Sequence, residues 1–143
     1  MGLLTISPAN AIFYFLELEE SYRQKTISLD TRTFNCALNA IATRSKPDSA
    51  EQAMNLLQRM LDYARDDSSV HPDGTTFNII LKILSKSQSP DAAHKAQTML
   101  VEMENMSTVK PSFISYLTCI IAWGRSKDKS KFDDVRGLLV RCQ

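Results

Sequence analysis

Two copies of one short motif decide the fold of this chain: Thr33-Phe34-Asn35-x-x-Leu38 and, 43 positions later (76 − 33), Thr76-Phe77-Asn78-x-x-Leu81. A looser copy, Ser115-Tyr116-x-x-x-Ile120, follows after a further 39 positions (115 − 76). Spacings of four and three place the apolar residues of each copy on one face of an α-helix. These faces are Phe34-Leu38-Ile41, Phe77-Leu81-Leu84 and Tyr116-Ile120-Trp123. A motif that recurs at such an interval indicates a repeat architecture.

A second helical pattern follows each motif at the same offsets. It runs Ala50, Ala53, Leu57, Met60, then Ala93, Ala96, Leu100, Met103, and finally Phe132, Val135, Leu139, Cys142. The alanines allow two helices to approach closely, and Leu and Met fill the space beneath them. In addition, residues 7–30 align without gaps on residues 89–112. We therefore expect the chain to begin with the second helix of a repeat and to end inside another, as a fragment or a degenerate array.

These patterns predict seven helices, at about 8–24, 31–44, 48–66, 74–87, 90–106, 113–126 and 131–142. Asp48-Ser49-Ala50-Glu51 predicts a capping box. Ser7-Pro8 and Ser89-Pro90 each predict an N-cap followed by proline at the first helical position. The expected fold is all-α, a helical-repeat solenoid of stacked antiparallel helix pairs forming an α-α superhelix. It is a single array, with a partial repeat at 1–30, repeats at 31–73 and 74–112, and a partial repeat at 113–143.

Composition restricts the function. The chain has 143 residues and a formal net charge of +1, from 17 Lys and Arg against 16 Asp and Glu. Proteins that hold nucleic acid mainly by charge are clearly basic, and this chain is not. Three cysteines without a CxxC spacing disfavour a disulfide framework and favour a reducing compartment. No apolar run approaches the ~20 residues of a membrane span, so no membrane partner is expected, and no signal or transit peptide is visible.

Catalysis is not expected. His71 and His94 have no second His, Cys or carboxylate at metal-ligand spacing. The acidic pair Asp66-Asp67 falls in an expected loop and Asp133-Asp134 at an expected helix start, where acids are usually solvated or favourable to the helix dipole. We therefore expect no enzyme, no cofactor, no metal and no small-molecule substrate.

The chain resembles the pentatricopeptide repeat family over nearly its whole length. The resemblance rests on the aromatic-Asn pairs Phe34-Asn35 and Phe77-Asn78, the Ala-x-x-Ala second helix ending in Met, and the closing Pro72-Asp73. Related tetratricopeptide repeats lack this opening and closure. The offsets of 43 and 39 exceed the usual family period of about 35 residues.

This resemblance implies single-stranded RNA in a groove lined by the first helices, with one base per repeat. Carried over, the reading pairs are Asn35 with Asp73, which favours uracil, and Asn78 with Ser112, which leans towards a pyrimidine. Arg32 and Thr75 occupy the positions that sandwich the base. The third repeat has Leu117 where a polar reader belongs, so base reading is in doubt there. The RNA-binding residues expected are Arg32, Asn35, Asp73, Thr75, Asn78, Ser112 and Lys82.

The helical positions of these residues agree in part with the RNA-binding expectation. Arg32, Asn35 and Asn39 share one helix face, as do Thr75, Asn78, Lys82 and Ser85, and amides with cations suit base edges and phosphates. In the third repeat the equivalent face is Ile114, Leu117 and Ile121, which fits burial by protein. An alternative stays open: each Asn hydrogen-bonds the neighbouring repeat and supports stacking, and Asp73 is a helix N-cap.

We therefore expect a single-stranded RNA-binding protein that acts in organelle RNA processing, stability or translation, in the mitochondrion or plastid by family resemblance. The rival is a helical-repeat scaffold that binds a protein through the apolar third repeat, favoured by the near-zero net charge. A third alternative is the RNA-binding arm of an enzyme such as a protein-only ribonuclease P, but no catalytic domain follows the repeats in this sequence. Exposed apolar ends of such an array favour self-association.

Overall fold

The computed structural model describes residues 11–24 and 29–143, and every regular element among them is an α-helix. The helices are α1 (Ala11–Arg23), α2 (Thr31–Arg44), α3 (Ser49–Asp66), α4 (Gly74–Lys86), α5 (Ala92–Asn105), α6 (Phe113–Arg125) and α7 (Lys131–Arg141). The predicted all-helical class is confirmed, and the predicted boundaries of α2 to α7 agree within two residues. The predicted start of the first helix and its Ser7-Pro8 cap lie outside the described residues.

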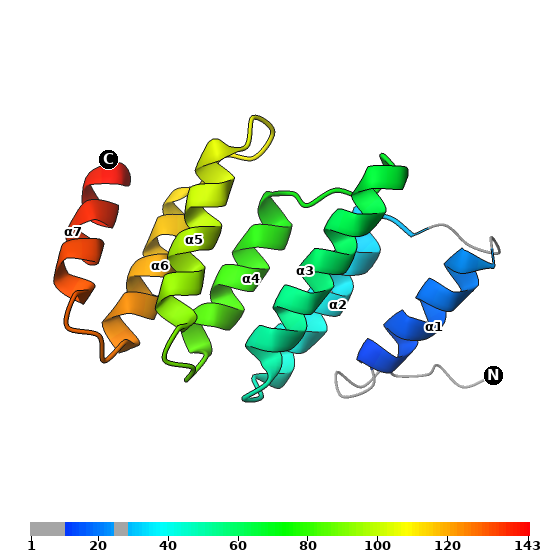
Figure 1. Cartoon of the computed structure of the whole chain (residues 1–143), viewed down its shortest axis with the longest axis horizontal. Helices are drawn as coiled ribbons and strands as arrows, with labels where there is room; N and C mark the ends of the chain where they lie inside the picture. The colour runs from blue at the N-terminus through cyan, green and yellow to red at the C-terminus, as the bar shows by residue number, and fades with distance from the viewer. Residues whose placement is uncertain (1–10, 25–28) are drawn as a thin grey trace.

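The helices with even labels form a row. Helix α4 packs against α2 on one side and α6 on the other. The helices with odd labels flank this row: α3 packs against α2 and α4, and α5 packs against α4 and α6. Figure 1 shows the resulting elongated arrangement, with α1 and α7 at opposite ends. Helix α1 packs on α2, and helix α7 packs on α6. These two helices therefore extend the arrangement at its two ends.

The two sets of helices begin differently. Helices α2, α4 and α6 start after extended N-cap residues, Asp30, Asp73 and Ser112, whose side chains accept a hydrogen bond from the backbone N–H three residues later. Helices α3, α5 and α7 start from Asp48, Asp91 and Ser130, which make no such side-chain bond. Pro72 and Pro111 directly precede two of the extended caps and cannot continue a helix.

Two predicted helix caps are therefore wrong. Asp48 has a near-helical backbone (φ −88°, ψ −1°), so its carboxylate does not reach the N–H groups of its helix and accepts a bond from Gln52 instead. Ser89-Pro90 does not cap α5, because Ser89 and Pro90 belong to the preceding turn and the N-cap is Asp91. In both places the chain makes a tight turn between two antiparallel helices. This turn sets backbone dihedrals from which the side chain cannot reach the first N–H groups of the helix.

The core consists of the apolar stripes found in the sequence. Phe34, Leu38 and Ile41 are fully buried in α2, and Phe77, Leu81 and Leu84 are buried in α4. The Ala-Ala-Leu-Met sets of α3 and α5 are buried as well. In the corresponding set of α7, Val135 packs against the core and Cys142 is partly buried, whereas Phe132 and Leu139 are exposed. No helix in the described ranges is long and apolar enough to cross a membrane.

Candidate nucleic-acid interface

Asn35 joins two neighbouring helices of the row. It lies in the second turn of α2, and its side chain is 9% exposed. Its Oδ1 accepts a hydrogen bond from the Thr76 hydroxyl (2.7 Å), and its Nδ2 donates to Asp73 Oδ1 (3.2 Å). Thr76 and Asp73 form the capping box at the start of α4. The amide of Asn35 therefore bonds directly to the groups that begin the next helix.

The same contact recurs one junction further along the row. Asn78 in α4 accepts a hydrogen bond at Oδ1 from the Ser115 hydroxyl of α6 (2.8 Å). Ser115 forms a capping box with Ser112, just as Thr76 does with Asp73. Thr76 and Ser115 are fully buried, so these bonds help to satisfy hydroxyls that have no contact with water. We call each set of three residues an amide clamp: Asn35–Asp73–Thr76 and Asn78–Ser112–Ser115.

Asp73 is held as a carboxylate. Partial burial raises the pKa of its side chain, but bonds from the Thr76 backbone N–H, the Thr76 hydroxyl and the Asn35 amide lower it more. The net pKa of Asp73 is below its ordinary value of 3.8. At neutral pH this residue is therefore a negatively charged acceptor at the mouth of the first clamp.

An open depression of about 660 Å³ lies beside the first clamp. Four of the expected RNA-binding residues line it together: Arg32, Asn35, Asp73 and Thr75. Asn39, Cys36 and His71 complete part of the wall. The lining offers a guanidinium, amides and a carboxylate within reach of one another, a set that can hydrogen-bond a polar planar group.

The remaining expected residues lie elsewhere. Lys82 and Ser112 are exposed and Asn78 is half-buried, but none of the three lines this depression. The equivalent face of α6 carries the apolar residues Ile114, Leu117 and Ile121, and all three are exposed. The polar face therefore covers α2 and α4 and ends at α6.

Sequence reasoning missed the partners of the two asparagines. Thr76 and Ser115 are motif residues, but they were assigned no contact. Their recurrence three residues after an Asp or Ser was the available signal, since that spacing is typical of a capping box. Thr31 was missed as well. Its hydroxyl donates to the His71 carbonyl (2.9 Å) and accepts from the His71 N–H (3.0 Å), which fixes the segment between α3 and α4 against α2.

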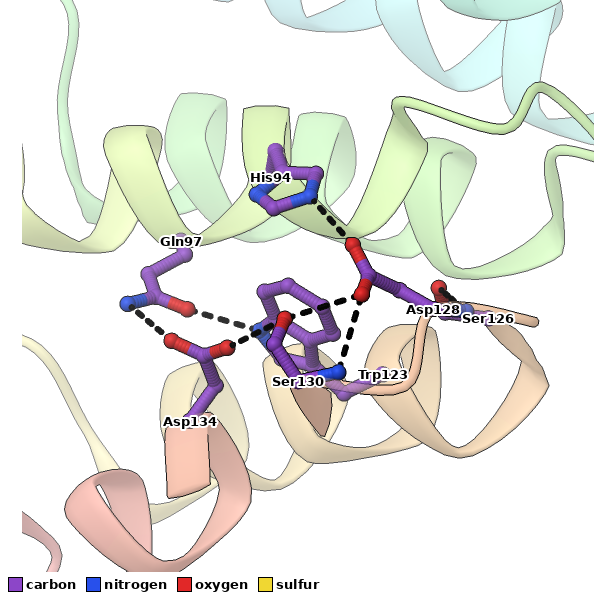
Figure 2. A network of polar contacts seen from close by, with 7 residues as sticks. All are labelled: His94, Gln97, Trp123, Ser126, Asp128, Ser130 and Asp134. Carbon is purple, nitrogen blue, oxygen red and sulfur yellow. Dashed lines mark hydrogen bonds and ion pairs between the residues drawn. The ribbon is translucent and has the colours of Figure 1, made fainter. Parts of the chain in front are cut away.

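His94 and Trp123 belong to a polar network that joins α5, α6 and α7. Figure 2 shows the His94 ring beside Asp128 and the Trp123 indole beside Gln97. His94 Nε2 lies 3.0 Å from Asp128 Oδ2, and Trp123 Nε1 donates to Gln97 Oε1 (2.7 Å). Gln97 in turn donates to Asp134 of α7 (3.3 Å). Fully buried Trp123 is thus a core residue and offers no stacking platform for a base.

The groups that could carry other chemistry are dispersed. Among the residues that the structure describes, no three His, Cys, Asp or Glu side chains are grouped to hold a metal ion. Burial raises the pKa of the Cys119 thiol to about 12, so it is protonated at neutral pH.

Comparison with models of known protein families, with curated proteins and with solved structures finds no match to this chain.

Proposed function

We propose that this chain is a pentatricopeptide-type helical-repeat solenoid that binds single-stranded RNA along α2 and α4 and performs no chemistry of its own. The observation that carries the proposal is the open depression beside the first clamp, where Arg32, Asn35, Asp73 and Thr75 gather. Asn35 and Asn78 occupy the same position on successive helices, and each begins a polar face that continues with Asn39 or Lys82. A repeated polar face at a fixed interval is the arrangement that reads successive bases of one strand.

Each asparagine keeps hydrogen-bonding groups that its clamp does not use and that a base can engage. An amide has two N–H hydrogens and two oxygen lone pairs. Asn35 uses one of each for Asp73 and Thr76, so one donor and one acceptor have no part in the clamp, and the residue also lines the depression. Asp73, kept ionised, adds an acceptor that suits the N–H of a uracil ring. Arg32 is exposed above them and can stack its guanidinium on the base.

The family resemblance supplies the rest of the proposal. It favours uracil at the Asn35–Asp73 pair and a pyrimidine at the Asn78–Ser112 pair. It also places the function in organelle RNA processing, stability or translation, in a mitochondrion or plastid. Two bases give little specificity, so we expect binding that is weak and sensitive to salt.

Fluorescence anisotropy with short labelled RNAs rich in U, C or A, and with the matching DNAs, tests this proposal at low salt. The informative variant is Arg32→Ala/Lys82→Ala, because both side chains are exposed and lie outside the clamps. We expect it to weaken binding to U-rich RNA by about tenfold. The matched control is Arg65→Ala/Lys95→Ala, which removes the same charge from α3 and α5 and should change affinity less than about twofold.

A second pair of variants tests base reading. Asn35→Ala/Asn78→Ala should abolish the preference for pyrimidine RNA over A-rich RNA, measured at a temperature where circular dichroism shows the variant folded, because it also removes two bonds between neighbouring helices. Equal binding to every RNA and DNA, unchanged in the variants, would contradict the proposal. So would the absence of any binding at low salt.

A specific observation supports a second candidate, a scaffold that binds a protein. Phe113, Ile114, Leu117 and Ile121 are between 42% and 68% exposed on α6, where the row presents its polar residues in α2 and α4. Exposed apolar patches of this kind mark protein contacts. If RNA binding fails, Ile114→Lys and Ile121→Lys variants should lose a protein partner that the wild-type chain retains.

A further inference from the structure

Charge is unevenly divided between the two long edges of the molecule. The turns that join α2 to α3, α4 to α5 and α6 to α7 lie along one edge, at the bottom of Figure 1. From the last residue of one helix to the N-cap of the next, these turns span residues 44–48, 86–91 and 125–130 and contain six Lys and Arg against three Asp. The corresponding segments of the other edge, 66–73 and 105–112, contain three Asp and one Lys. The formal net charge of +1 therefore conceals one basic edge.

The free positive charge of this edge comes mainly from lysine. The exposed lysines of the three turns are Lys46, Lys86, Lys127 and Lys129. Within residues 11–24 and 29–143, no carboxylate lies within ion-pair distance of their ammonium groups. The three Asp of the same turns are each held by a neighbouring side chain: Asp48 by Gln52, Asp91 by Lys95 and Asp128 by His94. We call the four lysines, together with exposed Arg125, the basic edge.

Two depressions join the three turns into one continuous surface. A depression of about 450 Å³ lies between the first and second turns, with Lys46 and Lys86 in its wall. Another, of about 800 Å³, lies between the second and third turns and is lined by Lys86, Arg125 and Lys127. Residues 86–89 line both. The basic edge is therefore a hollowed strip along the molecule.

The spacing of these cations selects a ligand with several anionic groups. Packed helices lie about 8–10 Å apart, so cations on successive turns are too far apart to share one small anion. Lysine binds phosphate as a point charge, and the Arg125 guanidinium can hold a phosphate through two parallel bonds. A chain that carries phosphates at regular intervals can engage all three turns. A nucleic-acid backbone is such a chain.

The polar face of α4 leads directly to the basic edge. Lys82 and Lys86 follow Asn78 at intervals of four residues, so the three side chains share one face of the helix. Eight residues of helix cover about 12 Å. A strand with a base at the second clamp therefore meets a cation midway along α4 and another where the turn begins.

We propose that the basic edge binds the phosphodiester backbone of the RNA strand, beyond the bases that lie at the two clamps. This inference rests on the proposed function for the identity of the strand and adds a second, sequence-independent contact to it. Phosphate contacts position a strand but read no base, so the edge contributes affinity and the groove contributes preference. Segregation of the acids to the other edge lets a nearly neutral chain hold a polyanion.

A ribose-phosphate oligomer without bases, about twelve units long, isolates this contact. Fluorescence anisotropy at low salt should show binding to the wild-type chain. The informative variant is Lys46→Gln/Lys127→Gln/Lys129→Gln, because these lysines are exposed and lie in turns, outside the packed helix faces. We expect it to bind the oligomer at least about tenfold more weakly, with unchanged circular dichroism.

The matched control removes three cations from the other edge. Arg23 and Arg65 are exposed at the ends of α1 and α3, and Lys110 is exposed between α5 and α6. Arg23→Gln/Arg65→Gln/Lys110→Gln has the same net charge as the informative variant. Its affinity for the oligomer should change less than about twofold, because these positions do not contact the strand.

RNA with bases separates the edge from the groove. On U-rich RNA of the same length, the triple lysine variant should lower the slope of log affinity against log salt by about 2, since each lost phosphate contact removes about 0.7. Its preference for U-rich over A-rich RNA should not change. Asn35→Ala/Asn78→Ala should do the reverse, losing the preference and keeping the slope.

Three results would overturn the proposal. The first is a wild-type chain that does not bind the oligomer at low salt, and the second is a triple lysine variant that binds it like the control. The third is tighter binding of a polyglutamate peptide or of anionic lipid vesicles than of the oligomer, which would assign the edge to another partner. Base preference enters none of these results, so failure of base reading and failure of the backbone contact are told apart.

Discussion

Individual side chains in this protein connect helices that are about 40 residues apart in sequence. Each asparagine of the repeated motif accepts a hydrogen bond from a fully buried hydroxyl. That hydroxyl belongs to the N3 residue of the next helix, where it also completes the capping box. A hydroxyl residue at position N3 thus caps its own helix and also fixes where that helix lies against the neighbouring helix.

Asp73 should make stability depend on pH. At neutral pH, Asp73→Ala should lower the free energy of unfolding by about 1–2 kcal/mol, since a helix cap and a bond to Asn35 are lost. The pKa of Asp73 is below its ordinary value of 3.8 in the folded chain. Its contribution is therefore complete above 3.8 and is lost as the pH falls below that value.

Urea titrations of wild type and Asp73→Ala at neutral and acidic pH measure this difference. The gap between the two proteins should narrow in acid. A gap that stays constant down to the lowest pH at which both proteins fold would show that the carboxylate form carries none of the stabilisation.

At the scale of elements, α1 is held by an aromatic contact and a buried ion pair. The rings of Phe15 and Phe34 lie 5.0 Å apart, which joins α1 to α2. Glu19, 4% exposed, pairs with Arg59 of α3. Removing the cationic partner of a buried carboxylate is destabilising, because the carboxylate then stays out of water without compensation.

Removing Arg59 should loosen α1. Arg59→Met should cost about 2 kcal/mol, because Glu19 stays buried without its partner. The double variant Glu19→Met/Arg59→Met should recover most of this loss, since two apolar side chains then pack together. Arg65→Met is the control: its pair with Asp62 is exposed and long (4.0 Å), so its effect should stay below about 0.5 kcal/mol. Chemical denaturation of the four proteins decides the matter, and a double variant as unstable as Arg59→Met would refute the ion-pair explanation.

For the whole molecule, stability should fall from the centre to the ends. Helix α4 packs against α2, α3, α5 and α6, whereas the packing of α7 is against α6. In a linear stack each element is stabilised by its neighbours, so central elements open last.

Hydrogen exchange followed by mass spectrometry should show this gradient. We expect amides of α4 to exchange slowest and those of α1 and α7 to exchange first. Uniform protection in all seven helices would contradict a neighbour-dependent stack.

The sequence by itself determined the all-helical class, the seven helices and the buried stripes, because helical periodicity and motif recurrence are local properties. The capping boxes at Asp73 and Ser112 were also within reach of local reasoning, since all their members lie within four residues. The box expected at Asp48 failed because the tight turn between α2 and α3 sets its backbone, which side-chain spacing does not reveal.

Only the tertiary structure decided what Asn35 and Asn78 contact. Their helical position allows them to face solvent or the next helix, and the packing of α4 on α2 and of α6 on α4 selects the second. The packing of α4 on α2 also brings Arg32 and Thr75 to one depression. Exposure of Phe132 and Leu139 depends on which helices cover α7, so an apolar pattern shared with α3 and α5 predicted burial that α7 does not have. A pattern states which face of a helix is apolar, but its burial requires a second surface, and that surface is a property of the assembled molecule.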